Sequence, residues 1–295
     1  MRVVVIINPI SGAYGRPAVA QQRALLATNF LSAAGVAHEV HITECPGHAY
    51  KLARGAVQRG VSVVFAWGGD GTMNEVGRAL AFSNTALALI PAGSGNGLAR
   101  ELCVPLDPTQ ALKKALHAAD HCIDVGQIDE YLFFNAAGIG FDAHVSMLFN
   151  NRPQQRRGLL PYVTIALREI FSYRPHTYDI RTNSETLRSR ALLIALANSR
   201  QYGNGAVVAP QARLDDGLLD LVVIQARSTL ATLKYARHLF TGTLATVNGV
   251  LMRKVTHATI TAQQPLSFHV DGEPLRNSRA TLTVQLHPAA LRVRR

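Results

Sequence analysis

Residues 61–72 read VSVVFAWGGDGT, a mostly apolar run followed by three glycines that surround Asp70, and then a threonine. A predominantly apolar run of this length is typical of a strand that is buried on both faces, as in a parallel sheet. The residues from Thr72 to Ala81 have the pattern of a helix. Strand, glycine-rich turn and helix in this order predict an α/β unit that binds its ligand at the carboxyl end of the strand.

The same alternation continues on both sides of this segment. Val3 to Ile7 is another β-branched run, and the loop from Asn8 to Pro17 contains glycine and proline. Further strands are expected at Ala37–Thr43 and Ala86–Ile90, and further helices at Ala18–Ala34 and Gly47–Gln58. We therefore expect residues 1–125 to form an α/β nucleotide-binding domain with a parallel sheet.

Beyond residue 125 the pattern changes to short alternating runs separated by turn residues. Two helical segments interrupt them, one from about Leu159 to Tyr173 and one from Ser228 to about Gly242. The predicted strands are Tyr131–Ala136, His176–Arg181, Arg190–Ala197, Leu218–Ile224, His257–Thr261, Leu266–Val270 and Thr281–Leu286. Residues 126–295 are therefore expected to form a mainly antiparallel β domain, whose last residues can return to the first domain.

The charge is unevenly distributed along the chain. Lys and Arg number 30 against 19 Asp and Glu, which gives a net charge of +11. Up to Val125 the net charge is +2, and the remaining residues carry +9. A basic second domain favours an acidic partner such as an anionic membrane, a nucleic acid or a phosphorylated ligand. A merely soluble, Arg-rich surface explains the same numbers, so both interpretations stay open.

Cysteine usage and hydropathy predict the compartment. The three cysteines are an odd number without C-x-x-C spacing, which argues against a disulfide framework or a zinc site and fits a reducing compartment. The apolar run Val3 to Ile7 is too short for a secretory signal. The longest uncharged run, residues 79–99, contains a proline and three glycines and cannot form a spanning helix. We expect a cytoplasmic protein whose membrane association, if it occurs, is peripheral.

Two further loops follow predicted strands. Asn8 to Gly12 can offer backbone N–H groups to a phosphate, but alone it is a weak signal. The loop Pro91 to Gly97, taken together with Gly68 to Thr72, indicates a cradle for a nucleotide polyphosphate. Asp70 within this cradle would repel bare phosphates, so it is a candidate Mg²⁺ ligand; a helix cap is the alternative. The P-loop pattern G-x-x-x-x-G-K-[ST] is absent.

The turn from Val270 to Pro274 places two carboxylates, Asp271 and Glu273, on either side of Gly272. An isolated turn of this kind is most simply a hairpin. Beside a phosphate cradle it becomes a candidate general base for a hydroxyl acceptor.

Together these motifs resemble the diacylglycerol kinase catalytic-domain superfamily, which includes soluble bacterial lipid kinases, sphingosine kinases and ceramide kinases. The resemblance covers essentially the whole chain. The matching motifs are NPISG at 8–12, GGDGTMNE at 68–75, PAGSGN at 91–96, IDVG at 123–126, GIGFDA at 138–143, LDDGL at 214–218 and VDGE at 270–273. It implies an α/β nucleotide domain followed by a β-sandwich, with the active site between them, and an ATP- and Mg²⁺-dependent lipid kinase.

The resemblance also implies residue roles. The ATP site would be lined by Asn8, Thr43, Gly68, Gly69, Asp70, Gly71, Thr72, Met73, Asn74 and Ser94. Asp70 and Asp124 would organise the catalytic Mg²⁺, and Glu273 would accept the proton of the lipid hydroxyl with Asp271 beside it. A second, structural Mg²⁺ would be held by the Asp216 carboxylate and the backbone carbonyls of Arg213 and Leu218.

The third motif departs from the bacterial diacylglycerol pattern Gly-Thr-x-Asn-Asp. Residues 94–97 read SGNG, which is closer to the sphingosine-kinase form, so the lipid itself stays open. A membrane surface is the expected partner. The segment from Arg152 to Tyr173, with Arg156 and Arg157 before an apolar stretch, fits an interfacial anchor or equally a core helix.

Three alternatives remain. NAD kinases share a similar GGDGT loop and phosphorylate a soluble hydroxyl, and a non-catalytic nucleotide sensor that docks on membranes would also need the cradle. A nucleic-acid role has no recognised motif in its favour, so no nucleic-acid partner is expected.

Overall fold

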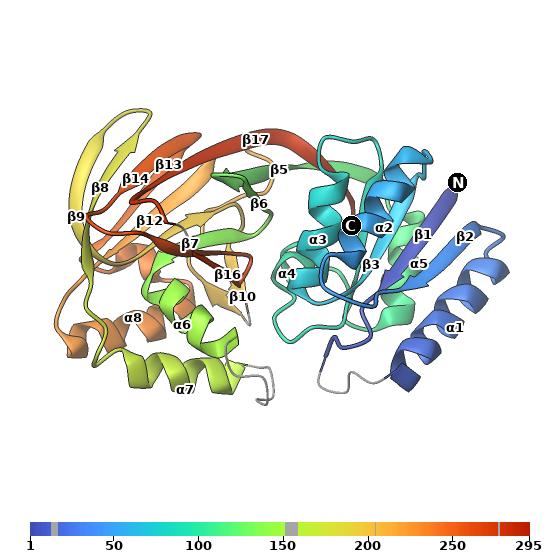
Figure 1. The fold of residues 1–295 in the computed structure, drawn as a ribbon, viewed down its shortest axis with the longest axis horizontal. Coiled ribbons are helices and arrows are strands. Elements are labelled where there is room, and N and C mark those ends of the chain that lie inside the picture. Colours follow the sequence, from blue (N-terminus) through green and yellow to red (C-terminus); the bar gives the residue numbers. More distant parts are fainter. Residues whose placement is uncertain (13–16, 151–158, 204, 277) are drawn as a thin grey trace. The chain divides into compact units, whose positions relative to one another are not determined.

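The structure is a computed structural model that describes residues 1–12, 17–150, 159–203, 205–276 and 278–295 (Figure 1). The chain divides into two compact units. The first comprises Met1–Ile123 together with Ala289–Arg295, and the second comprises Asp124–Pro288.

The first unit is built on a parallel sheet with the strand order β2-β1-β3-β4, and the end of β17 pairs beyond β4. Its strands are β1 (Arg2–Ile7), β2 (Ala37–Ile42), β3 (Val63–Gly68) and β4 (Ala86–Pro91). Nearly every residue of β1, β3 and β4 is buried, which explains their continuous apolar runs. Ile7 pairs with Trp67, and Gly68 pairs with Pro91. The carboxyl ends of these strands are therefore level with one another.

Helices cover both faces of this sheet. The step from β1 to β2 runs toward one edge of the sheet, and the steps from β2 to β3 and from β3 to β4 run toward the other edge. Because such crossovers are right-handed, α1 lies on one face of the sheet and α2 and α3 lie on the other. The helix α5 packs beside α1, and α2 packs against α3. The bounds are α1 (Pro17–Ala33), α2 (His48–Gln58), α3 (Asp70–Leu80), α4 (Gly97–Glu101) and α5 (Pro108–His117).

The second unit is built from antiparallel strand pairs: β5 with β6, β7 with β9 and β15, β8 with β9 and β14, β12 with β9 and β13, β10 with β11, β14 with β17, and β15 with β16. One path of paired strands runs β16-β15-β7-β9-β8-β14-β17, and β12 and β13 branch from β9. The bounds are β5 (Asp120–Ile128), β6 (Tyr131–Phe133), β7 (Ala136–Gly140), β8 (His176–Thr182), β9 (Thr186–Ala197), β10 (Gln201–Gly203), β11 (Ala206–Val207), β12 (Leu219–Gln225), β13 (Val250–Val255), β14 (His257–Thr261), β15 (Ser267–Val270), β16 (Glu273–Arg276) and β17 (Thr281–Arg294).

Two apolar cores lie in the second unit. One fills the sandwich between strands, and the other lies under the helices. Along β12, Leu219, Leu221 and Val223 face the first core while Val222 and Ile224 face the second. This strand is therefore apolar throughout instead of alternating. The helices are α6 (Phe141–Asn150), α7 (Leu159–Glu169) and α8 (Thr229–Thr241), and the 3₁₀ turn η1 is Leu244–Thr246.

Several strands differ from their predictions, and β5, β10, β11, β13 and β16 were not predicted. The run predicted as one strand from Tyr131 to Ala136 is two strands, because the backbone N–H groups at the break donate to the Asp271 carboxylate. The strand expected to end at Leu286 continues to Arg294, and it bends where Ala289 adopts a left-handed conformation. The strand β13 was not predicted, because charged residues interrupt its apolar pattern.

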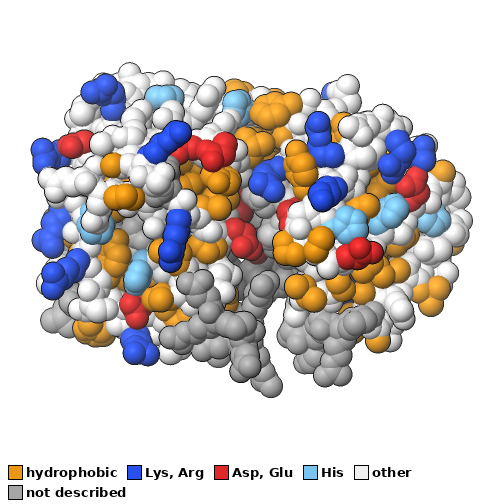
Figure 2. Space-filling view, in the orientation of Figure 1, with side chains coloured by type: hydrophobic (Ala, Val, Ile, Leu, Met, Phe, Trp, Pro, Cys, Tyr) orange, Lys and Arg blue, Asp and Glu red, His pale blue; other side chains and the backbone are white. Residues whose placement is uncertain are grey.

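No helix in the described ranges is both long and apolar enough to cross a bilayer. Ile165 of α7 is buried in the second core, whereas Leu167 and Phe171 are 48% and 71% exposed. The arginines at 152, 156 and 157, which were expected to assist membrane contact, lie outside the described residues. On the face drawn in Figure 2, Lys and Arg side chains are scattered over both units and do not gather into one basic patch.

Candidate active site

Three loops of the first unit follow the carboxyl ends of β1, β3 and β4, and hydrogen bonds join them. Asn8 Nδ2 donates to Thr72 Oγ1 at 2.9 Å, which links the first loop to the start of α3. The backbone N–H of Asn8 donates to Trp67 O at 2.9 Å, so the first loop continues the pairing of β1 with β3. The sequence prediction that these loops share one sheet edge is therefore consistent with the geometry.

Asp70 joins the second loop to the third. It is the first residue of α3, and its Oδ1 and Oδ2 accept the backbone N–H groups of Gly97 at 2.7 Å and Asn96 at 2.9 Å. A carboxylate is also a ligand of the kind that Mg²⁺ prefers, because this cation binds oxygen. The chemistry of Asp70 therefore fits both a loop-joining role and a role as a Mg²⁺ ligand.

Glycines in these loops allow the loops to touch one another. A Cβ added to Gly93 would lie 2.6 Å from the Cα of Gly69, and one added to Gly95 would lie 2.6 Å from Asp70 Oδ2. A Cβ on Gly12 would lie 2.6 Å from the carbonyl oxygen of Ala92. The glycines were explained from sequence by the approach of an anion, but close loop-to-loop packing alone already requires them.

Asn96 closes the third loop. Its Oδ1 accepts the Gly93 N–H at 2.9 Å, its Nδ2 donates to Gly93 O at 2.8 Å, and its backbone is left-handed with φ 51°. The predicted ATP contact Ser94 is exposed within this loop. Asn96 was quoted as part of a motif but was not assigned a role, because nothing local distinguishes it from an ordinary turn residue.

Arg23 of α1 is hydrogen-bonded to the first loop. Its guanidinium donates to Asn8 O at 3.3 Å, Ser11 Oγ at 3.0 Å and Ser11 O at 3.2 Å. Burial lowers the pKa of Arg23 from its ordinary value. It places a positive charge beside a loop expected to meet phosphate. Arg23 was not predicted, because no motif surrounds it.

The remaining predicted ATP residues differ in exposure. Thr43 follows β2, is nearly buried, and donates its backbone N–H to Ile7 O at 2.9 Å. Asn74 and Met73 lie in α3 and are 7% and 2% exposed. Met73 is part of the apolar core. Gly71 and Thr72 lie in the first turn of α3, where backbone N–H groups lack helical acceptors and can bind phosphate oxygens.

In the second unit, Asp271 and Gly272 form the two-residue loop of the hairpin between β15 and β16. Both have positive φ, 47° and 87°, and Val270 pairs with Glu273, as in a type I′ Asp-Gly turn. The Asp271 carboxylate accepts the N–H groups of Phe134 at 3.1 Å, Asn135 at 2.8 Å and Ala136 at 3.2 Å. Hydrogen bonds of this kind stabilise the ionised form of a carboxylate.

Glu273 is the first residue of β16 and its side chain is exposed. Within the described part of the chain, no hydrogen bond or ion pair to its carboxylate is found. The two carboxylates of the motif therefore differ: that of Asp271 is bound by backbone N–H groups and stabilises the turn, while the oxygens of Glu273 can still accept hydrogen bonds.

A buried polar cluster lies behind this hairpin. His269 Nε2 is 3.0 Å from Asp142 Oδ2 and 3.2 Å from the hydroxyl of Tyr202, which itself donates to Asp142. Burial and the nearby Asp142 charge raise the pKa of Tyr202 well above its ordinary value. On its other side His269 Nδ1 accepts the N–H of Gly272 at 3.4 Å. The cluster therefore supports the turn that precedes Glu273.

Asp124, a predicted Mg²⁺ ligand, lies in β5 and is 3% exposed. Its Oδ2 accepts the N–H of Gly217 at 2.7 Å. The fully buried Asn198 donates to both Asp124 O at 2.8 Å and Phe134 O at 2.9 Å. Through Asn198, the Asp124 strand is connected to the loop that Asp271 holds, so motifs far apart in sequence meet in the second unit.

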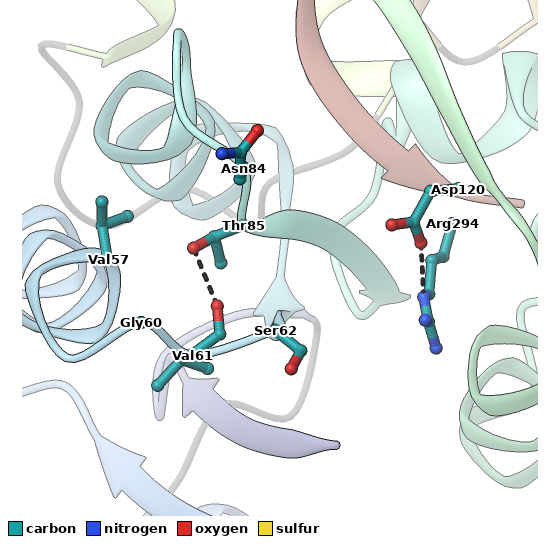
Figure 3. Close-up of a pocket in the computed structure, with 8 residues that line it drawn as sticks. All are labelled: Val57, Gly60, Val61, Ser62, Asn84, Thr85, Asp120 and Arg294. Carbon is teal, nitrogen blue, oxygen red and sulfur yellow. Dashed lines mark hydrogen bonds and ion pairs between the residues drawn. The ribbon is translucent and has the colours of Figure 1, made fainter.

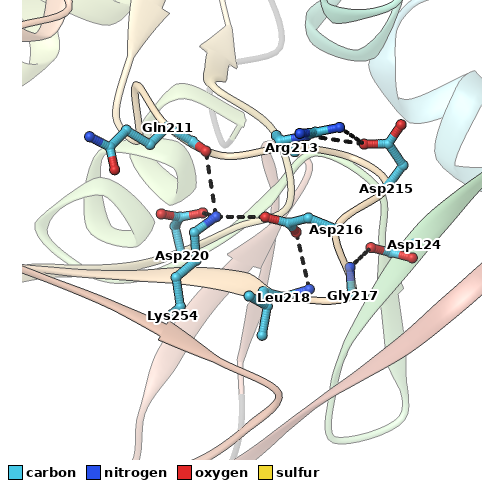
Figure 4. Close-up of polar contacts among 9 residues, drawn as sticks. All are labelled: Asp124, Gln211, Arg213, Asp215, Asp216, Gly217, Leu218, Asp220 and Lys254. Atoms are coloured by element: carbon cyan, nitrogen blue, oxygen red, sulfur yellow. Dashed lines mark hydrogen bonds and ion pairs between the residues drawn. The ribbon is translucent and has the colours of Figure 1, made fainter.

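Asp216, the predicted ligand of a structural cation, contacts Lys254 (Figure 4). Its Oδ1 accepts the N–H of Leu218 at 3.1 Å, and its Oδ2 is 2.9 Å from Lys254 Nζ. The Arg213 guanidinium is engaged by Asp215 at 3.4 Å. Burial opposes the charge of Lys254, yet hydrogen bonds to Asp220 and Asp216 raise its pKa on balance. No group of three or more His, Cys, Asp and Glu side chains suited to a metal occurs among the described residues.

A pocket of about 490 Å³ opens at the opposite edge of the first unit's sheet (Figure 3). It is lined by Ser62 and Thr85, which precede β3 and β4, and by the ion pair of Asp120 with Arg294 at 2.8 Å. These residues are at the amino ends of the strands. The predicted ATP residues surround the carboxyl ends, so this pocket is not the candidate active site.

Comparison with known proteins identifies both units. Residues 2–128 match the diacylglycerol kinase catalytic domain, and residues 135–295, more than half of the chain, match the YegS C-terminal NAD kinase beta sandwich-like domain. A "Probable lipid kinase YegS-like" of Klebsiella pneumoniae (strain 342) is 33% identical over 91% of this chain and 89% of its own length. Its namesake in Pseudomonas putida is 32% identical over 86% and 83%.

Solved structures show the same fold. A diacylglycerol kinase from Bacillus anthracis superposes with a TM-score of 0.74 at 20% identity, covering 99% of this chain and 96% of that one. A further chain from the same organism gives a TM-score of 0.81 at 24% identity, with 99% and 94% covered. The α/β and β-sandwich prediction is thereby confirmed. From the match over both units and the identity with these relatives, the chain is a kinase that belongs to the YegS-like lipid kinase family.

Proposed function

We propose that the chain transfers the γ-phosphoryl group of ATP, with Mg²⁺, to the hydroxyl of a membrane lipid such as diacylglycerol or a sphingoid or other lipid alcohol. The observation that carries this proposal is the set of three glycine-containing loops at the carboxyl ends of β1, β3 and β4. The hydrogen bond of Asn8 to Thr72 joins the first loop to the second, and Asp70 joins the second to the third. This arrangement offers backbone N–H groups and one carboxylate at the sheet edge where α/β folds bind their ligands.

In the proposed reaction, ATP supplies the transferable phosphoryl group and Mg²⁺ neutralises its negative charge. The first-turn N–H groups of Gly71 and Thr72 bind phosphate oxygens, and Asp70 holds the cation directly or through water. Asp124 was also expected at the cation, and its carboxylate, which accepts the N–H of Gly217, offers oxygen of the kind that Mg²⁺ binds. Phosphoryl transfer depends mainly on such positioning and charge neutralisation.

Glu273 accepts the proton of the lipid hydroxyl as the new O–P bond forms. The exposed carboxylate of Glu273 has no hydrogen-bond partner among the described residues, whereas the Asp271 carboxylate already accepts three backbone N–H groups. We therefore assign Glu273 as the general base and Asp271 as the residue that positions it.

The decisive experiment incubates the purified chain with γ-labelled ATP, Mg²⁺ and a panel of micellar lipids that includes diacylglycerol, sphingosine and ceramide. Label in a lipid product that requires Mg²⁺ is the expected result, and the panel identifies the lipid. A parallel reaction contains NAD in detergent-free buffer. Absence of label from every lipid, while ATP is bound, would leave the nucleotide-sensor function instead.

NAD phosphorylation is the second candidate function, since the second unit matches a domain described as NAD kinase beta sandwich-like. The YegS-like relatives and the net charge of +9 beyond residue 125 favour the lipid. Label in NAD but in no lipid would reverse the assignment.

The lipid substrate requires contact with a bilayer surface, which we propose to be peripheral. Exposed Leu167 and Phe171, at and just after the end of α7, are suited to insertion at the lipid interface. Replacing both with Ser should weaken flotation with vesicles that contain anionic lipid. The matched control replaces exposed Phe82 of the first unit with Ser and should leave flotation unchanged. Equal flotation of all three proteins would show that these residues do not contact the bilayer.

A further inference from the structure

Sheet register fixes the position of the Lys254 ammonium. Lys254 on β13 lies directly opposite Asp220 on β12, and its Nζ is 2.8 Å from Asp220 Oδ2. The same nitrogen is 2.9 Å from Asp216 Oδ2 and 3.4 Å from the carbonyl oxygen of Gln211 (Figure 4). Three oxygens from the strand and from the loop before it therefore surround one ammonium.

The carboxylates in this cluster need a positive partner. The Asp220 side chain is 7% exposed and that of Asp216 is 19% exposed. A carboxylate this far removed from water is costly unless it is paired and hydrogen-bonded. Lys254, whose side chain is 34% exposed, supplies that partner to both from a single position.

The same Asp216 carboxylate was expected to bind a structural Mg²⁺ together with two backbone carbonyls. In the structure both of its oxygens have protein partners, Leu218 N–H and Lys254 Nζ. Leu218 thus approaches Asp216 with a hydrogen-bond donor. Magnesium binds oxygen at about 2.0–2.1 Å and requires near-octahedral geometry. It could share Oδ2 with the ammonium only against strong repulsion between the two cations.

We infer that Lys254 takes the place of the structural cation in this chain and that the second unit does not depend on a divalent metal for its stability. A metal stabilises a protein only as far as its free concentration allows, whereas an ammonium attached to β13 is always present. This inference concerns the loop from Gln211 to Leu218 and does not rest on the proposed reaction.

The test follows backbone hydrogen exchange of residues 214–225 in the nucleotide-free chain, once with excess EDTA and once with millimolar MgCl₂. The natural chain should show the same protection in both buffers. Lys254→Met keeps the stem of the side chain but removes the charge. With EDTA its exchange should be faster by about tenfold or more, as expected when buried charges lose their partner. Magnesium should restore much of that protection, because the vacated position can then accept a divalent cation.

Lys113→Met, at an exposed lysine of α5, is the matched control and should behave as the natural chain does. Loss of protection in the natural chain on adding EDTA would overturn the inference. Unchanged exchange in Lys254→Met would also overturn it, since the ammonium would then support nothing. Should Lys254→Met fail to fold, the natural chain in the two buffers still tests the inference. Equal hydrogen exchange with EDTA and with MgCl₂ supports it, and faster exchange with EDTA contradicts it.

Discussion

Replacing Asp70 with Asn separates the two roles that the carboxylate has in the first unit. The oxygens accept the N–H groups of Asn96 at 2.9 Å and Gly97 at 2.7 Å. Asn offers one acceptor and turns an NH₂ donor toward the other N–H. One hydrogen bond to a charged group, worth about 1.5–3 kcal/mol, is lost and the other is weakened. We expect the free energy of unfolding to fall by about 3 kcal/mol, which corresponds to a melting temperature lower by roughly 6–12 °C.

Activity should fall further than this loosening explains. Loss of a charge that holds Mg²⁺ against the triphosphate should lower kcat by about a hundredfold or more, measured well below both melting temperatures. The Mg²⁺ concentration at half-maximal rate should also rise, which loosening of the loops alone would not cause. Asp107→Asn is the control, because Asp107 caps α5 with one bond from Gln110 N at 2.9 Å and Asn caps equally well.

Near-natural turnover at saturating Mg²⁺, together with a lowered melting temperature, would show that Asp70 only joins the loops. An unchanged melting temperature would refute the hydrogen-bond geometry itself.

Three further predictions address the hairpin and the glycines. Glu273→Gln should lower kcat by about 10²–10⁴-fold with the KM for ATP and the melting temperature unchanged, as measured by initial rates and calorimetry. Asp271→Asn should lower the melting temperature by roughly 4–8 °C, since the carboxylate accepts three N–H groups and the amide can accept fewer. A large loss of kcat in Asp271→Asn together with a lowered melting temperature in Glu273→Gln would mean that Asp271 is the general base and Glu273 the positioning residue. Gly93→Ala should lower the melting temperature because its Cβ would lie 2.6 Å from the Cα of Gly69, while Gly55→Ala inside α2 should raise it by a small amount. Equal melting temperatures for the two glycine variants would mean that the loops can separate without cost.

The amino-acid sequence by itself determined the fold class and the place of the nucleotide loops. Residues such as Val63 to Trp67 are buried on both faces of the sheet. A strand buried in this way needs apolar side chains at every position, so it is visible in the sequence as a continuous apolar run. Turn chemistry is also local, so glycine-rich loops at strand ends could be located from residue order alone. The family resemblance added residue roles, such as that of Glu273, that no local pattern contains.

The partner of each polar side chain was decided only by the tertiary structure. Asp70 and Asn96, Asp271 and Phe134, and Lys254 and Asp216 are separated by between 26 and 137 residues. Hydrogen bonds and ion pairs between distant residues have no periodicity that a sequence pattern could reveal. Strand register brings Lys254 opposite Asp220, and a shift of one residue would turn it to the other face of the sheet. For this reason Asp216 could be identified as a candidate metal ligand from the sequence, whereas its contact with Lys254 could not be predicted.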